Sequence, residues 1–147
     1  MSIEEKIREN LKEKIIDGYR HSQRRCYFSI KPQDIVEVAN FLFNELSLRF
    51  SIATAIDTPK GIEILYHFSF DKSGEIFSVR VLIEDKKNPQ IDSLTSLFPA
   101  AEWIEREIWE LFGVNFKGHP NLKHLLLHED WPQDKHPLRK KDPQVTP

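Results

Sequence analysis

The chain has 147 residues, of which 39% are hydrophobic and 30% charged, so length and composition predict one globular domain. Its 21 basic and 23 acidic residues leave a net charge of −2, whereas a nucleic-acid-binding domain of this size normally carries a clear basic excess. A single cysteine, Cys26, excludes an internal disulfide and every multi-cysteine zinc or iron–sulfur site. No apolar run approaches the ~18 residues that span a bilayer. We therefore expect a soluble, cytosolic protein without an iron–sulfur cluster of its own.

The first 46 residues predict two helices separated by a strand. Apolar residues recur at every fourth position among Glu, Lys and Arg, which is typical of an amphipathic helix, and Gly18 marks its end. These residues are Ile3, Ile7, Leu11 and Ile15. Residues 26–30 (CYFSI) are aromatic and β-branched and predict a short strand. Pro32 and Asp34 then begin a second helix. Its apolar face consists of Ile35, Val38, Ala39, Leu42, Phe43 and Leu46.

Three further strands and a third helix are predicted between residues 49 and 113. The strands and turns follow in the order 49–57, turn 58–61, 62–70, turn 71–74 and 75–84. A helix from about Pro99 to Phe112 ends at Gly113. Together with the first strand, this order predicts an α+β fold: an antiparallel sheet of about four strands packed with helices, followed by an extended, proline-rich C-terminal tail.

Residues 117–147 form this tail, after an α+β body of residues 1–116. The tail holds five of the nine prolines and four of the six histidines, and a segment so rich in proline cannot form a long helix or a central strand. Its net charge is +2, against −6 for residues 26–116. It is nevertheless too apolar for a disordered segment, and we expect its apolar side chains to be buried on another surface. These side chains are Leu122, Leu125, Leu126, Leu127, Trp131 and Leu138.

Motifs of nucleotide binding and of serine hydrolases are missing, because the sequence contains neither a glycine-rich phosphate loop nor GxSxG. Cys26 lies in an apolar strand and is interpreted as a core residue rather than a reactive thiol. His124 and His128, with Glu129 or Asp130, could bind zinc, and His119 and His136 flank them. The residues between His124 and His128 favour an extended strand, however, in which the two side chains would lie about 13 Å apart. We therefore favour polar or packed histidines, with a metal site as the alternative.

Four glutamates and one arginine occupy the predicted helix 99–112. They are Glu102, Glu105, Glu107, Glu110 and Arg106. Arg106 is four residues from both Glu102 and Glu110, a spacing at which side chains meet on a helix. Acid–base catalysis would require two carboxylates in different environments within a cleft. The pattern favours an ion-paired helix surface, partly buried at an interface, and leaves a catalytic pair as the alternative.

Residues 105–126 (EREIWELFGVNFKGHPNLKHLL) interleave charged and aromatic side chains beyond what core packing requires. The stretch resembles the signature of the C-subunit family of NADH dehydrogenase (complex I). In that signature E-R-E is followed, after two residues of any type, by an acid and two apolar residues. A His comes after six more residues, then a base after three more residues, and finally two aliphatic residues after one more. The residues that match it are Glu105, Arg106, Glu107, Glu110, Leu111, Phe112, His119, Lys123, Leu125 and Leu126. HEDW (128–131) and HPLRKKDP (136–143) continue the resemblance, with Lys141 as a small departure.

The resemblance implies a non-catalytic α+β scaffold subunit, without a redox centre, in the peripheral arm of complex I. Its C-terminal segment would lie along the larger, quinone-site core subunit. Iron–sulfur clusters, flavin or a [NiFe] centre would be bound by partner subunits. The family includes the equivalent subunit of energy-converting [NiFe] hydrogenases and of formate hydrogenlyases, which are the alternative. The implied location is the cytoplasmic side of the cell membrane, reached only through the complex.

The residues expected at the partner interface are those of the signature together with Trp131, Pro137, Leu138, Arg139 and Lys140. Trp131 and Leu138 are expected to fill pockets of the partner, and Arg139 to meet an acidic group. Residues from about 129 onward are expected to be mobile in the free subunit and ordered in the complex. Arg106 is expected to be partly desolvated and paired with carboxylates. A small free-standing enzyme and an unrelated interaction module are the competing hypotheses.

Overall fold

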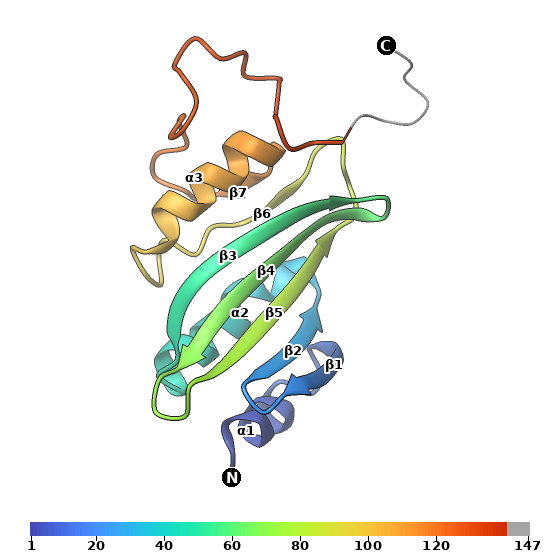
Figure 1. The fold of residues 1–147 in the computed structure, drawn as a ribbon, viewed down its shortest axis with the longest axis vertical. Helices are drawn as coiled ribbons and strands as arrows, with labels where there is room; N and C mark the ends of the chain where they lie inside the picture. The colour runs from blue at the N-terminus through green and yellow to red at the C-terminus, as the bar shows by residue number, and fades with distance from the viewer. Residues whose placement is uncertain (141–147) are drawn as a thin grey trace.

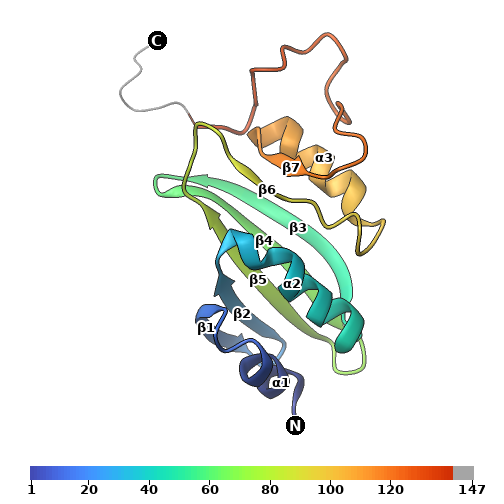
Figure 2. The same cartoon turned by 180° about the vertical axis from the view of Figure 1, so that it is seen from behind.

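A five-stranded sheet with helices on one of its faces forms the centre of the fold, which is α+β as predicted (Figures 1 and 2). The computed structural model describes residues 1–140. The strands are β1 (Ile15–Ser22), β2 (Arg25–Ile30), β3 (Arg49–Thr58), β4 (Gly61–Phe70) and β5 (Glu75–Ile83). Their order across the sheet is β1-β2-β5-β4-β3, and neighbours are antiparallel except β2 and β5, which are parallel. The sheet thus has one strand more than expected and one parallel pair.

The N-terminal helix is shorter than predicted. Helix α1 covers Ile3–Asn10, and residues 15–22 form β1 rather than the end of the helix. β1 pairs antiparallel with β2, where Gly18 lies so close to Phe28 that an added Cβ would be 2.9 Å from the Phe28 ring. The prediction was wrong because helical spacing is a local signal. The edge of β2 offers unpaired backbone groups, and residues 15–22 satisfy them.

The second helical segment and the three strands after it confirm the prediction. The segment consists of a 3-10 turn η1 (Pro32–Asp34), α2 (Ile35–Asn40) and a π-helical turn η2 (Phe41–Glu45), and α2 covers one face of the sheet (Figure 2). Side chains on the helix-covered face of the sheet form the core. Those of β4 and β5 are Ile62, Ile64, Tyr66, Phe68, Phe77, Val79, Val81 and Ile83. Cys26 is buried beside them, as interpreted, and burial raises the pKa of its thiol to about 11.

Helix α3 (Ala101–Phe112) confirms the predicted helix 99–112 and lies beside β3, at the end of the molecule opposite α1 (Figure 1). Gly113 ends it in the left-handed conformation, with φ of 79°, and donates its N–H to the carbonyl of Trp109. Two short strands, β6 (Gln90–Asp92) and β7 (Asn115–Lys117), form a separate parallel pair. They went unpredicted because three residues are too few for a recognisable alternation.

Apart from Lys117, which belongs to β7, the described part of the tail runs around α3 without forming a helix or strand of its own. Residues 118–140 contain turns and bends (Figure 1). The extended strand expected between His124 and His128 is therefore wrong. Lys141, Pro143 and Pro147, which belong to the predicted tail, lie outside the described residues. Within residues 1–140, none of the helices combines the length and the apolar character needed to cross a membrane.

Candidate functional site

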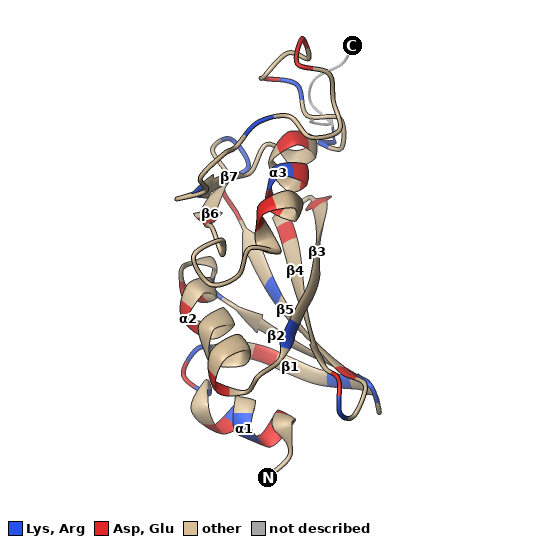
Figure 3. Ribbon diagram, turned by 90° about the vertical axis from the view of Figure 1, so that its left-hand side faces the viewer, with Lys and Arg blue, Asp and Glu red and all other residues tan. Residues whose placement is uncertain are grey.

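Three charged side chains of α3 are buried, although the sequence favoured an ion-paired helix surface. Glu105 and Glu110 are each 1% exposed and Arg106 is 6% exposed. Figure 3 shows acidic and basic residues following one another along this helix. Burying a charge costs free energy unless hydrogen bonds replace those made with water. Each of the three groups makes these bonds to a segment that has no regular secondary structure.

Glu110 receives the backbone N–H groups of three consecutive tail residues. Its carboxylate accepts hydrogen bonds from the amides of Leu125 (3.1 Å), Leu126 (2.9 Å) and Leu127 (2.7 Å), and its Oε1 lies 3.1 Å from Nδ1 of His124. Burial by itself would raise the pKa of Glu110, but the three amide bonds and His124 outweigh it and hold this pKa below its ordinary value. Residues 125–127 cannot form a strand here because their N–H groups converge on one carboxylate.

Arg106 binds the carbonyls that precede these amides. Its Nε donates to the carbonyl of Lys123 (3.1 Å) and its Nη2 to that of His124 (2.7 Å). The guanidinium also lies over the ring of Trp103, 5.1 Å from the ring centre. The expected pairing of Arg106 with carboxylates is wrong, because these two carbonyls are the hydrogen-bond partners of its guanidinium among residues 1–140. Arg106 and Glu110 together satisfy consecutive peptide groups of the tail, one through donors and the other through acceptors.

Glu105 holds the loop that follows β6. Its carboxylate accepts hydrogen bonds from the Ser93 hydroxyl and the Leu94 amide, each at 2.6 Å. Burial raises the pKa of Glu105 to about 7, and the two hydrogen bonds only partly oppose this effect. Glu105 is therefore a buried acid that titrates near neutral pH.

The tail also caps the C-terminal end of α3, where helix carbonyls lack partners within the helix. Nδ1 of His136 donates to the carbonyl of Glu110 (3.0 Å), and the amide of Leu138 donates to that of Leu111 (2.9 Å). Nη1 of Arg139 donates to the carbonyl of Phe112 (3.1 Å). A cation at this position also interacts favourably with the negative end of the helix dipole.

A second buried carboxylate, Asp57 near the end of β3, meets the last described residues of the tail. It is 1% exposed. Nζ of Lys86 lies 2.6 Å from its Oδ1, and the amide of Lys140 donates to its Oδ2 at 2.7 Å. Nε of Arg139 lies 3.4 Å from Oδ2. Arg139 was expected to meet an acidic group of a partner; in this structure that group is Asp57 of the same chain.

Sequence reasoning did not single out Asp57, although a signal was present. In the alternating strand 49–58, Ala53 and Asp57 fall at positions that face the core, and both are buried. A carboxylate at a core position needs cationic or hydrogen-bonding partners. The sequence contains many Lys and Arg residues, so those partners could not be identified without the fold.

The other predicted interface residues differ in how far their side chains are exposed to solvent. Nε2 of His119 donates to the carbonyl of Glu102 (2.9 Å), and the indole N–H of Trp131 donates to the carbonyl of Lys135 (2.7 Å). Phe112 is buried. The half-buried ones are Glu107, Leu111, His119, Leu125 and Arg139. The exposed ones are Lys123, Leu126, Trp131, Pro137, Leu138 and Lys140.

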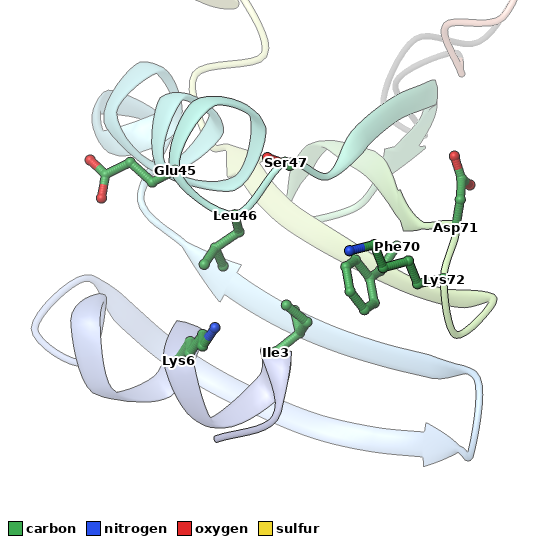
Figure 4. A pocket seen from close by; sticks show the side chains of 8 residues that line it. All are labelled: Ile3, Lys6, Glu45, Leu46, Ser47, Phe70, Asp71 and Lys72. Carbon is green, nitrogen blue, oxygen red and sulfur yellow. The ribbon is translucent and has the colours of Figure 1, made fainter.

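Neither the histidines nor the hollow beside α1 forms an obvious chemical site. Within residues 1–140 there is no group of three or more His, Cys, Asp or Glu side chains arranged to hold a metal ion. A hollow of about 400 Å³ lies between α1, η2 and the turn after β4 (Figure 4). Its charged lining residues are Lys6, Glu45, Asp71 and Lys72. None of these belongs to the signature.

The fold and the α3–tail contacts are those of a small α+β domain whose signature helix fixes the C-terminal segment. The family model described as "Respiratory-chain NADH dehydrogenase, 30 Kd subunit" matches residues 28–147. The chain belongs to this family, which confirms the resemblance found in its sequence.

Curated relatives agree with this assignment. The chain is 38% identical over 121 residues to the C subunit of NADH-quinone oxidoreductase from Roseiflexus sp. (strain RS-1), covering 78% of this chain and 67% of the relative. It is 34% identical over 123 residues to the protein of the same name from Salinispora tropica, covering 78% of this chain and 48% of the relative. The chain thus spans between about half and two thirds of the length of these relatives.

Solved structures have the same fold. One comes from the membrane-bound sulfane sulfur reductase, an archaeal respiratory membrane complex, with a TM-score of 0.77 and 25% identity over 92% of this chain and 82% of that one. Another is a trypsin-resistant fragment of Nqo5, with a TM-score of 0.64 and 22% identity over 83% of this chain and all of the fragment. The second likeness supports the fold alone.

Proposed function

We propose that this chain is a structural subunit of the peripheral arm of a complex I-like NADH:quinone oxidoreductase, without a catalytic site of its own. In this role it contacts the larger, quinone-site core subunit while electron transfer is coupled to ion pumping. Membership of the 30 Kd subunit family and the relatives named as C subunits of NADH-quinone oxidoreductase support the type of complex.

One observation carries the non-catalytic role: the buried charged groups of the signature are hydrogen-bonded to the chain's own backbone and, at Glu105, also to the Ser93 hydroxyl. Glu110 accepts three tail amides, Arg106 donates to two tail carbonyls, and Glu105 binds the loop after β6. A general acid, base or nucleophile must reach a substrate. Groups buried and bonded in this way stabilise a shape instead.

The surface offered to the partner is the outer side of the α3–tail unit, by which we mean helix α3 and residues 118–140. Large apolar side chains are exposed there, among them Trp103 (60%), Leu126 (63%) and Leu138 (51%). Trp131, which is 37% exposed, adds a residue type that often anchors interfaces. An obligate partner would bury such side chains much as a core does.

Other subunits of the complex would supply the redox centres and the attachment to the membrane. We propose that iron–sulfur clusters, flavin or a [NiFe] centre are bound by partner subunits. The subunit would lie on the cytoplasmic side of the cell membrane and reach the membrane through its neighbours.

A second candidate is the equivalent subunit of an energy-converting [NiFe] hydrogenase or formate hydrogenlyase complex. The observation that favours a complex of another kind is the TM-score of 0.77 to a chain of an archaeal respiratory membrane complex other than complex I. The two candidates share the structural role and differ in the identity of the core partner.

Affinity purification from native membranes tests the proposal. A tagged full-length chain should recover a larger redox subunit in stoichiometric amount, and mass spectrometry of that subunit distinguishes the two candidates through the presence or absence of [NiFe]-ligating cysteines. Trp131→Asp should abolish recovery, whereas Ile16→Asp, a matched exposed apolar residue of β1 at 64% exposure, should not. Recovery of the chain alone, or loss of the partner only in Ile16→Asp, would contradict the proposed interface.

A further inference from the structure

Asp57 is a buried carboxylate at a point where three distant segments meet. It lies at the second-last residue of β3, opposite Ile62 of β4, and is 1% exposed. Leaving such a group without counter-charges would cost several kcal/mol, so its partners are part of its structural role. They come from the loop after β5 and from the tail, up to 83 residues away in sequence.

The tail residues at Asp57 also bind the rest of the chain. Arg139 donates Nη2 to the carbonyl of Lys86 at 2.6 Å and Nη1 to the carbonyl of Phe112 at 3.1 Å, while its Nε faces Asp57. Lys86 in turn donates its Nζ to the carbonyl of Thr58 at 3.0 Å. Asp57, Lys86 and Arg139 therefore connect the end of β3, the loop after β5, the end of α3 and the tail.

Four of the five residues 136–140 are bonded to the body. His136, Leu138 and Arg139 cap three carbonyls at the end of α3, and Lys140 donates its amide to Asp57. Gly113 leaves room for this path, since an added Cβ there would lie 2.6 Å from the ring of His136. Groups of the body, not of a partner, satisfy these backbone and side-chain positions.

We propose that Asp57 is a binding site for the basic segment 136–140 of its own chain, and that this contact is a latch that fixes the tail on the body before any partner binds. The latch makes the tail a preformed docking element. A preformed element loses less conformational entropy on association than a segment that folds on binding. This replaces the expectation of a tail that is mobile until assembly. The consequence for assembly rests on the proposed function, whereas the latch itself does not.

Amide hydrogen exchange of the free, full-length chain tests the latch. In the wild type, the amides of Leu138 and Lys140 should be protected, and Asp57→Asn should lower their protection at least tenfold while the amides of β4 and β5 keep theirs. Asp71→Asn is the matched control, because this acid also pairs with an arginine, Arg49, but lies in the turn after β4. The control should leave the tail amides protected.

A second variant acts from the tail and leaves the buried carboxylate paired with Lys86. Arg139→Met removes the guanidinium and should lower the protection of the Leu138 and Lys140 amides at least tenfold, without depending on whether Asp57→Asn folds. Unprotected tail amides in the free wild-type chain, or unchanged protection in Arg139→Met, would overturn the latch.

Assembly is measured separately, so that the two proposals fail in different ways. If the latch presents the tail to the partner, Arg139→Met should reduce recovery of the core subunit from native membranes. If exchange changes as predicted and the core subunit is nevertheless fully recovered, the latch is upheld and its proposed role in assembly is contradicted.

Discussion

The sheet with α1 and α2 and the α3–tail unit are stabilised in different ways. The first is an apolar core between paired strands and helices, in which Phe68, Phe77 and Val81 are fully or almost fully buried. In the second, residues 118–140 form no helix or strand, and buried charged side chains of α3 satisfy their peptide groups. The sheet resembles an ordinary small domain, whereas the tail depends on a few polar contacts.

The difference shows how an irregular, proline-rich segment can be ordered. Proline prevents a regular ladder, so the backbone groups of the segment must find other partners or remain in water. Glu110 supplies one carboxylate for three amides, and Arg106 supplies one guanidinium for two carbonyls. Each such group affects several peptide units at once. Its loss should therefore release the tail without unfolding the sheet.

The largest effect is expected from a change in the core. Phe68→Ala should lower the free energy of unfolding of the whole chain by about 3–5 kcal/mol, because it removes a fully buried ring and leaves a cavity. Chemical denaturation monitored by far-ultraviolet circular dichroism measures the change. Ile52→Ala, at a 48% exposed position of β3, is the control and should change stability by less than about 1 kcal/mol. Equal effects of the two substitutions would be inconsistent with a core that lies only on the helix-covered face of the sheet.

The next largest effect should be confined to the tail. Glu110→Gln replaces a carboxylate, which only accepts hydrogen bonds, with an amide whose NH₂ group cannot accept them. The free energy of local opening of the tail should therefore fall by about 2–3 kcal/mol. Native-state hydrogen exchange at Leu125, Leu126 and Leu127 measures it. Glu107→Gln, on the same helix but only half-buried, should have little effect. A uniform loss of protection across β4 and β5 would show that tail and sheet unfold as one unit.

A somewhat smaller effect is expected from the donor side of the same contact. Arg106→Ala should cost about 2 kcal/mol of tail stability, since two carbonyls lose a charged donor. Arg106→Lys should restore part of it, because an ammonium can reach a carbonyl but lacks the planar fork that serves both. Exchange rates of the tail amides in the two variants give the comparison. If Arg106→Lys were as damaging as Arg106→Ala, the fork geometry rather than the charge would determine the contact.

The smallest effect, measured per pH unit, is a dependence of stability on pH through Glu105. Its pKa is about 7 in the folded chain, above the ordinary value of 4.5, so the folded state binds more protons between these values. The contribution of Glu105 is therefore fully present below about pH 4.5 and is lost as the pH rises through about 7, at no more than about 1.4 kcal/mol per pH unit. Denaturation midpoints from pH 4.5 to 8 measure the slope. Glu105→Gln should flatten it, and an unchanged slope in this variant would assign the effect to another group.

Local patterns were sufficient where the structure depends on neighbours in sequence. The alternation in residues 75–83 and the glycine after residues 101–112 predicted β5 and the end of α3 correctly. They were misleading at Ile15, whose spacing continues a helix although the residue begins β1. The reason is that β1 exists through its pairing with β2, and no pattern within residues 1–22 records that partner.

The α+β class, the second and third helices, the strands β2 to β5 and the family could all be predicted from the amino-acid sequence, because helical spacing, alternation, turn residues and the signature of residues 105–126 are local. The role of the signature charges could not. Whether Glu105, Arg106 and Glu110 face solvent, one another or the backbone depends on where the tail runs around α3, and whether Asp57 meets Arg139 depends on segments 82 residues apart. The physical reason is that a charge leaves water only where the fold brings it the opposite charge or free peptide groups, and folding in three dimensions sets those positions.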